Sequence, residues 1–196
     1  ASIISGFFGK FIGDRNSEII TSLLVTISAI LSSFVLYEVI LNKYEDNIII
    51  ATWISSGTLD VNWSIKIEPL SAIMLVVVTS VSSLVHIYSI GYMSHDPHKP
   101  RFMAYLSLFT FAMLMLVTSD NFIQLFFGWE GVGLCSYFLI GFWFKKDSAN
   151  KAAIKAFVVN RVGDFGFALG IFLIFYLFGT VNYSEVFELI PTIIDK

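Results

Sequence analysis

The chain has 196 residues, of which 56% are hydrophobic and only 14% are charged, and its mean hydropathy is +0.78. About a quarter of the residues of a typical soluble domain are charged, so this composition indicates a membrane protein. The net charge of −3 argues against a nucleic-acid partner, and the single cysteine, Cys135, supports neither a disulfide framework nor a cysteine metal site.

Apolar segments long enough to cross a bilayer recur along the chain. A helix needs roughly 18–25 apolar residues to cross about 30 Å of hydrocarbon. We expect five such helices, at about 18–41, 70–93, 102–118, 122–144 and 152–178. Residues 1–13 are apolar but too short to span, and we interpret them as the end of a further, partial helix. The segment after 178 is assigned no helix.

Most lysines and arginines fall at one end of these expected helices. If the GDRNSE turn faces inside, the inner side holds eight of the twelve: Lys10, Arg15, Lys99, Arg101, Lys145, Lys146, Lys151 and Lys155. Short cytoplasmic loops are rich in basic residues, so we expect the 94–101 and 145–151 loops on the cytoplasmic or matrix side. The 42–69 loop then lies outside, and its β-branched and aromatic residues predict a small hairpin. The expected fold is an all-α polytopic membrane protein with one membrane domain over 1–196.

Glu130 is the one ionisable residue in the run LFFGWEGVGLCSYFLIGFWF. It lies about 12 Å from the outer end of its helix, near the membrane midplane. A lone carboxylate at that depth costs at least a few kcal/mol, so we expect it to face the bundle interior and to find a partner, water or a proton. The alternative is a polar residue that only fixes helix packing, a role that Asn or Gln would fill at lower cost.

The next expected helix carries further charges in VVNRVGDFGFALG. Arg161 and Asp164 are three positions apart, so they share a helix face and can pair. Counting the rise per residue puts Asp164 within a few ångströms of the depth of Glu130, which predicts a cluster of three charges. A purely structural ion pair remains the alternative reading. Lys155 lies nearer the interface, where it either joins this cluster or extends its ammonium group to water.

Histidines suggest two further sites. His86 is the one histidine at membrane depth, on a stripe with Thr79, Ser82 and Ser89 at helical spacing, and it reads either as a proton relay or as a hydrogen-bonded packing residue. In the loop HDPH, His95, Asp96 and His98 resemble metal ligands. The flanking prolines and the lack of a third strong ligand favour a solvated turn, so we expect no metal.

Redox cofactors require ligands that this sequence does not provide. One intramembrane histidine does not make a two-histidine haem site, no cysteine cluster is present to hold iron and sulfur, and no glycine-rich nucleotide motif follows a strand. We therefore expect no cofactor and no catalytic residue on this chain. Ionisable groups at half-depth instead suit transport of protons or small cations.

Long stretches resemble subunit 5, also called subunit L, of the proton-pumping NADH-quinone oxidoreductases. The resemblance rests on GWEGVGLCSYFLIGFWF and NKAAIKAFVVNRVGDFG, and extends through GYMSHDPHKPRFMAYLSLFTFAMLMLVTSDNFIQLF and IEPLSAIM. It implies an antiporter-like fold of inverted helical repeats, of which this chain is an N-terminal portion. It also implies a mitochondrial inner membrane or a bacterial cytoplasmic membrane, with neighbouring antiporter-like subunits as partners and NADH, FMN, iron-sulfur clusters and quinone on other subunits.

The same resemblance implies roles for individual residues. Glu130 matches the family's intramembrane carboxylate of proton translocation, and Arg161 and Asp164 match the charged positions of its NRVGD motif. Two alternatives stay open: the large subunit of a multisubunit sodium/proton antiporter, and a structural membrane scaffold whose charges only fix packing.

Overall fold

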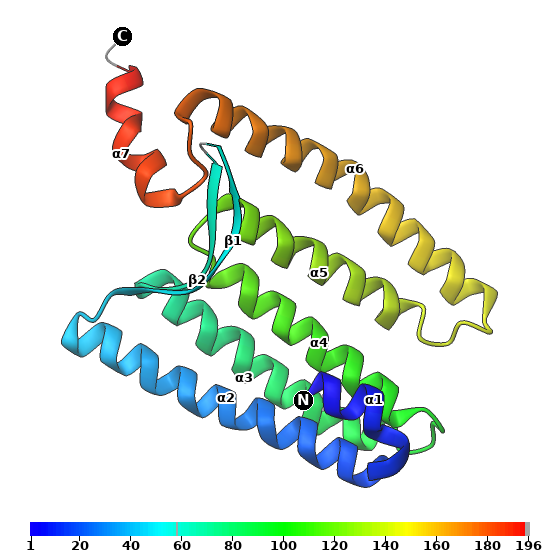
Figure 1. Ribbon diagram of the computed structural model, residues 1–196. Coiled ribbons are helices and arrows are strands. Elements are labelled where there is room, and N and C mark those ends of the chain that lie inside the picture. Colours follow the sequence, from blue (N-terminus) through cyan, green and yellow to red (C-terminus); the bar gives the residue numbers. More distant parts are fainter. Residues whose placement is uncertain (58, 195–196) are drawn as a thin grey trace.

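The computed structural model describes residues 1–57 and 59–194, with residues 192–194 described by their backbone alone. Its elements in chain order are α1 (Ser2–Ile12), α2 (Asp14–Asn42), β1 (Asp46–Ser56), β2 (Leu59–Ile67), α3 (Pro69–Tyr92), α4 (Lys99–Val117), α5 (Phe122–Ile140), α6 (Asp147–Phe178) and α7 (Tyr183–Ile194) (Figure 1). Helices α2 to α6 are long and apolar enough to cross a membrane, judged by length and composition. The expected all-α polytopic fold with one hairpin is confirmed.

Helix ends differ from the expected ranges where turn chemistry overrides hydropathy. Helix α4 begins at Lys99 because Pro100 fits a first helical turn, which has no N–H bond to lose. Helix α5 ends at Ile140, with Gly141 as its C-cap and a turn beyond it. Helix α6 begins at Asp147 rather than 152, since an acidic residue in the first turn interacts favourably with the positive end of the helix dipole. Helix α7, to which the hydropathy reading assigned nothing, is short and amphipathic.

Close helix contacts depend on glycines in α5 that face α4. At Gly128 an added Cβ would lie 2.6 Å from the backbone nitrogen of Leu116 and 2.7 Å from its Cα. At Gly131 it would lie 3.0 Å from the Cβ of Ala112. Small residues thus let the two backbones approach closely, the arrangement by which membrane helices gain packing energy without a hydrophobic driving force.

The hairpin is fastened to the turn between α4 and α5 by buried amides. The side chain of Gln124 accepts a hydrogen bond from the Ser64 backbone nitrogen (3.0 Å) and donates one to the Ser64 carbonyl (2.7 Å). The side chain of Asn121 donates to the carbonyl of Asn62 (2.9 Å) and accepts from the Gln124 backbone nitrogen, which caps α5. These bonds hold β2 over the ends of two helices, because leaving any of the buried groups unpaired would cost free energy.

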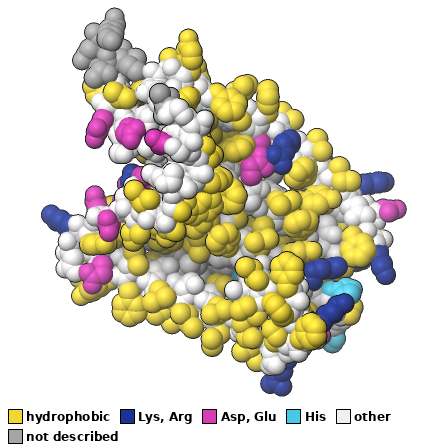
Figure 2. Space-filling view, in the orientation of Figure 1, with side chains coloured by type: hydrophobic (Ala, Val, Ile, Leu, Met, Phe, Trp, Pro, Cys, Tyr) yellow, Lys and Arg dark blue, Asp and Glu magenta, His cyan; other side chains and the backbone are white. Residues whose placement is uncertain are grey.

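The two ends of the bundle differ in character. The hairpin and the turns at 118–121 and 179–182 lie at one end, and the turns at 13, 93–98 and 141–146 lie at the other (Figure 1). Figure 2 shows hydrophobic side chains over most of the visible face, with most charged side chains gathered toward the ends. The basic loops of the sequence analysis therefore share the end opposite the hairpin.

Substituting Gly128 tests the contact between α4 and α5. We expect Gly128→Ala to destabilise the protein by roughly 1–3 kcal/mol, because the methyl group meets backbone atoms rather than a movable side-chain tip. Gly133→Ala in the same helix is the matched control, since its Cβ meets nothing within 4 Å. Thermal unfolding of the purified full-length assembly gives the comparison, and equal midpoints for the two variants would contradict the close-contact account.

Cysteine labelling in oriented vesicles tests the topology. We expect Ser94→Cys and Ser148→Cys, both exposed, to react with a membrane-impermeant maleimide from the cytoplasmic or matrix side, because those loops hold most of the basic residues. Thr52→Cys in the exposed strand β1 should react from the opposite side, and the native Cys135 is buried. Labelling of the two loop variants from the outer side alone would reverse the assignment.

Candidate functional site

The charged residues of α5 and α6 meet because these helices run side by side (Figure 1). Aromatic rings fill the space between them: Phe167 of α6 makes edge contacts with Phe126 and Trp129, with ring centroids 5.6 and 6.0 Å apart. Tyr137 contacts Phe157 nearer the other end, at 5.5 Å. This packing fixes the rotation of each helix, so that the polar side chains of both face the same seam.

In that seam, one guanidinium group contacts two carboxylates. Nη1 of Arg161 donates to Oε1 of Glu130 at 2.5 Å, and its Nε lies 3.9 Å from Oδ2 of Asp164. The guanidinium also lies over the ring of Phe157, 4.8 Å from its centroid. Two negative charges and one positive charge leave the three residues with one excess negative charge, a balance that a proton or a further cation would change.

Asp164 has a second partner that the sequence analysis missed. Its Oδ1 accepts a 2.7 Å hydrogen bond from the indole nitrogen of Trp129, the residue next to Glu130. A tryptophan N–H in an apolar run needs an acceptor, so the sequence did indicate that Trp129 has a hydrogen-bond partner. It did not indicate which residue, because the acceptor lies on another helix. Trp129 thereby ties α5 to α6 beside the ion pair.

The two carboxylates differ in how deeply they are buried. The side chain of Asp164 is 9% exposed, that of Glu130 is 25% exposed, and that of Arg161 is 50% exposed. The three-residue spacing correctly predicted that Arg161 and Asp164 share a face. The closer contact of Arg161 is nevertheless with Glu130, across the helix interface, because a charge-assisted hydrogen bond is far more favourable at 2.5 Å than an ionic contact at 3.9 Å.

Lys155 lies apart from this cluster. It is exposed on α6, nearer the end that carries the basic loops. Over residues 1–57 and 59–191, whose side chains the structure describes, it forms no ion pair with Glu130 or Asp164. Its position fits an ammonium group that reaches toward the interface.

His86 lies on the other side of the bundle, where α3 packs against α4. The ring is fully buried, with Nδ1 2.8 Å from the carbonyl of Ser82 and Nε2 3.0 Å from the hydroxyl of Ser107. A carbonyl only accepts, so Nδ1 carries a proton. Ser82 continues the contacts to Thr110 of α4 at 2.6 Å. Both ring nitrogens are engaged, which fits the packing reading, and the structure does not bring His86 into contact with Glu130 or Arg161.

The HDPH loop forms a closed turn rather than an open ligand set. Oδ1 of Asp96 accepts from the backbone nitrogen of His98 (2.8 Å), and Oδ2 accepts from the indole of Trp143 (2.9 Å). Burial alone would raise the pKa of Asp96, but these two donors and the nearby charges of His98 and Arg101 lower it. In the part of the chain that the structure describes, no three His, Cys, Asp or Glu residues are placed to hold a metal ion.

Comparisons with known proteins agree on one family. Residues 53–103 match the family model described as NADH-ubiquinone oxidoreductase (complex I), chain 5 N-terminus, and residues 119–195 match the one described as NADH:quinone oxidoreductase/Mrp antiporter, TM. The chain is 59% identical over 186 residues to NADH-ubiquinone oxidoreductase chain 5 of Triticum aestivum, and 53% identical over 197 residues to NADH-quinone oxidoreductase subunit L of Rhodobacter capsulatus. The chain belongs to the chain 5/subunit L family.

The matches cover almost all of this chain but only part of each relative. They cover 95% and 97% of this chain but only 28% and 27% of the two relatives, so the chain spans little more than a quarter of their length. Among solved structures, the membrane-bound sulfane sulfur reductase, an archaeal respiratory membrane complex, is similar with a TM-score of 0.80 at 20% identity, over 94% of this chain and 37% of that one. That likeness shows the fold alone.

Double-mutant cycles test how the guanidinium is shared. We expect Arg161→Gln alone to reduce assembly strongly, because it leaves two carboxylates without a cation, a loss of about 3–5 kcal/mol for a buried pair and less for groups this exposed. Adding Glu130→Gln should recover more than adding Asp164→Asn, since the Glu130 contact is shorter. Assembly level and thermal midpoint are the readouts. Additive losses in both cycles would show that these residues act independently.

Proposed function

We propose that this chain is the N-terminal portion of a proton-translocating membrane subunit of NADH-quinone oxidoreductase. The observation that carries the proposal is the contact of the single Arg161 guanidinium with two carboxylates, Glu130 at 2.5 Å and Asp164 at 3.9 Å, from neighbouring membrane helices. Membership of the chain 5/subunit L family supports the same reading. The subunit is part of an enzyme, proton-translocating NADH:ubiquinone reductase, and itself performs no redox chemistry.

The geometry suggests how charge would move. While Arg161 donates to Glu130, the guanidinium compensates the negative charge of the carboxylate. If Arg161 shifts toward Asp164, Glu130 is left without a cation in an apolar setting, where the neutral acid is the favoured form. Glu130 then takes a proton from water on one side, and the return of Arg161 expels that proton. A redox event on another subunit would drive the shift by differential interaction with the two arrangements.

Asp164 and Trp129 act as the second position for the guanidinium. Asp164 is the more buried carboxylate and accepts a hydrogen bond from the Trp129 indole in addition to its contact with Arg161. It is therefore able to hold a negative charge while Arg161 pairs with Glu130. Lys155 and His86 are proposed as accessory groups on a path to the inner side, a role for which their present contacts provide no direct link to Glu130.

The proposal places cofactors and partners on other chains. NADH, FMN, iron-sulfur clusters and quinone would be bound by other subunits, and the nearest partners would be neighbouring antiporter-like membrane subunits. The chain would lie in a mitochondrial inner membrane or a bacterial cytoplasmic membrane as a multi-pass protein. The breadth of exposed hydrophobic side chains on α6, including Val162, Phe165 and Phe172, suits contact with lipid or with further helices.

A second candidate is the large subunit of a multisubunit sodium/proton antiporter. The family model over 119–195 names the Mrp antiporter beside the oxidoreductase, so that part of the chain does not separate the two. The model over 53–103 names complex I chain 5 alone, and the relatives at 53–59% identity are oxidoreductase subunits. Co-purification with quinone and iron-sulfur subunits would decide between them.

Conservative substitutions at Glu130 test proton translocation against a scaffold role. Glu130→Gln keeps the shape and hydrogen bonding but does not titrate, while Glu130→Asp titrates with a shorter reach. We expect the Gln variant to assemble and still reduce quinone, yet to pump protons far less well than the Asp variant. Proton uptake by proteoliposomes is measured beside NADH oxidation. Normal pumping per electron with Gln in a verified complex would reduce Glu130 to a structural residue.

A further inference from the structure

A groove lies between α1 and the first half of α4, away from the α5–α6 seam. It encloses about 660 Å³ and opens toward the surface of the bundle. The short helix α1 forms one wall, where the hydroxyl of Ser5 donates to the carbonyl of Pro100 at 2.9 Å. At Gly9 an added Cβ would lie 2.7 Å from the Cβ of Pro100, so the helices touch at the base of the groove.

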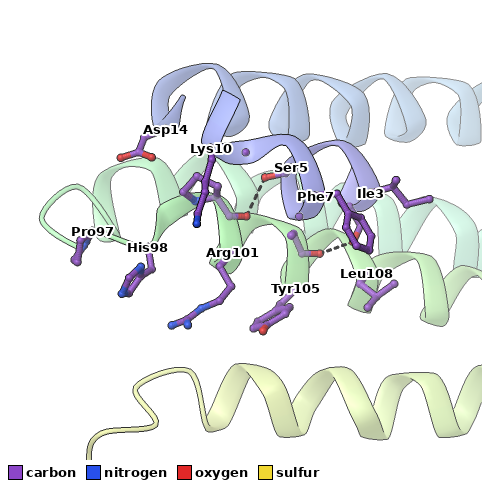
Figure 3. A pocket seen from close by; sticks show the side chains of 15 residues that line it. Ile3, Ser5, Phe7, Lys10, Asp14, Pro97, His98, Arg101, Tyr105 and Leu108 are labelled. Carbon is purple, nitrogen blue, oxygen red and sulfur yellow. Dashed lines mark hydrogen bonds between the residues drawn. The ribbon is translucent and has the colours of Figure 1, made fainter. Parts of the chain in front are cut away.

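The groove is polar at one end and apolar at the other. Figure 3 shows Lys10, His98 and Arg101 toward the end where the 93–98 loop lies, and Phe7 and Leu108 toward the middle of the bundle. The polar end is the one that carries the basic loops. A gradient of this kind, along the axis of the helices, matches an amphipathic molecule that lies parallel to them.

The two cations at the polar end, Lys10 and Arg101, differ in the contacts that they already make. Lys10 is exposed and forms no ion pair over residues 1–57 and 59–191, whereas Lys99 nearby lies 3.9 Å from the carboxylate of Glu18. Nη2 of Arg101 donates to the carbonyl of Phe142 at 3.2 Å, and the guanidinium lies over that ring, 4.6 Å from its centroid. The ammonium group of Lys10 is therefore the donor at this end that is accessible to an anion in the groove.

The local acidic groups do not cancel this positive charge. Asp14 is the one carboxylate among the residues that line the groove, against the charges of Lys10 and Arg101. Asp96, close to Arg101, already accepts hydrogen bonds from a backbone nitrogen and an indole. The first turn of α4 begins at this end as well, and the positive end of its helix dipole favours an anion.

We propose that this groove binds an anionic phospholipid, with its phosphate between Lys10 and Arg101 and its acyl chains along Phe7 and Leu108. Basic pockets between membrane helices on the cytoplasmic or matrix side recognise such headgroups. A free phosphate ion would leave the apolar half unused, where the side chain of Phe7 is 80% exposed. A zwitterionic lipid would gain little from two cations. The site is independent of proton movement at Glu130.

Photo-crosslinking in the full-length protein within its complex tests this site. The photoreactive residue p-benzoylphenylalanine replaces Phe7, and the complex is reconstituted into phosphatidylcholine liposomes that contain tetraoleoyl cardiolipin or dioleoylphosphatidylglycerol. Mass spectrometry should find adducts enriched in the anionic lipid over its share of the bilayer. The same photoreactive residue at Phe172, which is 67% exposed on α6, should report bulk lipid without enrichment.

Charge variants complete the test. Lys10→Gln should lower the anionic adduct about five-fold, the ratio that corresponds to about 1 kcal/mol for one lysine near a phosphate. Lys151→Gln, an exposed lysine at the same end but outside the groove, should leave the adduct unchanged, and Lys10→Arg should retain it. Cross-links to another segment of the chain or to another subunit, no adduct at all, adducts in bulk proportion, or indifference to Lys10→Gln would each overturn the proposal.

Discussion

The site depends on one electrostatic constraint: two carboxylates and one guanidinium lie in a seam between apolar helices. Water in bulk would screen and solvate these charges, but here each charge depends on its neighbours. The contacts of Arg161 at 2.5 Å with Glu130 and 3.9 Å with Asp164 leave the second carboxylate partly compensated by an indole N–H. The proposed proton movement requires a second arrangement, in which the guanidinium pairs with Asp164 and Glu130 becomes neutral.

The remaining fold keeps this seam in register. Gly128 and Gly131 bring α5 against α4 on the face opposite the seam, so α5 has little freedom to rotate. At the end of the bundle that carries the hairpin, Gln124 fastens the start of α5 to β2, and the backbone nitrogen of Phe122 donates to the carbonyl of Val181 just after α6. Both helices of the seam are thus tied at one end. Movement of Arg161 from one carboxylate to the other would therefore require rotation of its side chain or displacement of α5 or α6 at the end away from the hairpin.

Much of this was predictable from local pattern. Hydropathy located the five long helices because a bilayer demands about twenty apolar residues. A carboxylate at half-depth marked Glu130, and three-residue spacing placed Arg161 and Asp164 on one face. Helical spacing also aligned the polar stripe of α3 that contains His86. These features depend on the sequence within one helix, which is why they could be read without the partner helices.

The features that escaped prediction depend on how helices are rotated against each other. The indole of Trp129 is hydrogen-bonded to Asp164, and the imidazole of His86 is hydrogen-bonded to Ser107, in each case on a neighbouring helix. The spacing of residues within one helix does not identify such partners. The preference of Arg161 for Glu130 over its own helix neighbour has the same origin. Helix α7 was missed because its length and its amphipathic character fall outside a search for membrane spans.

Infrared difference spectra, variant minus wild type, recorded on the fraction of the complex that still assembles, test most directly whether Arg161 sets the charge of Glu130. Replacing Arg161 with Gln should produce the carbonyl stretch of a protonated carboxylic acid, and that band should disappear when Glu130→Gln is added. The band should persist when Asp164→Asn is added instead, which assigns it to the residue with the closer contact. A spectrum of Arg161→Gln without the band, or with a band that survives Glu130→Gln, would contradict the account.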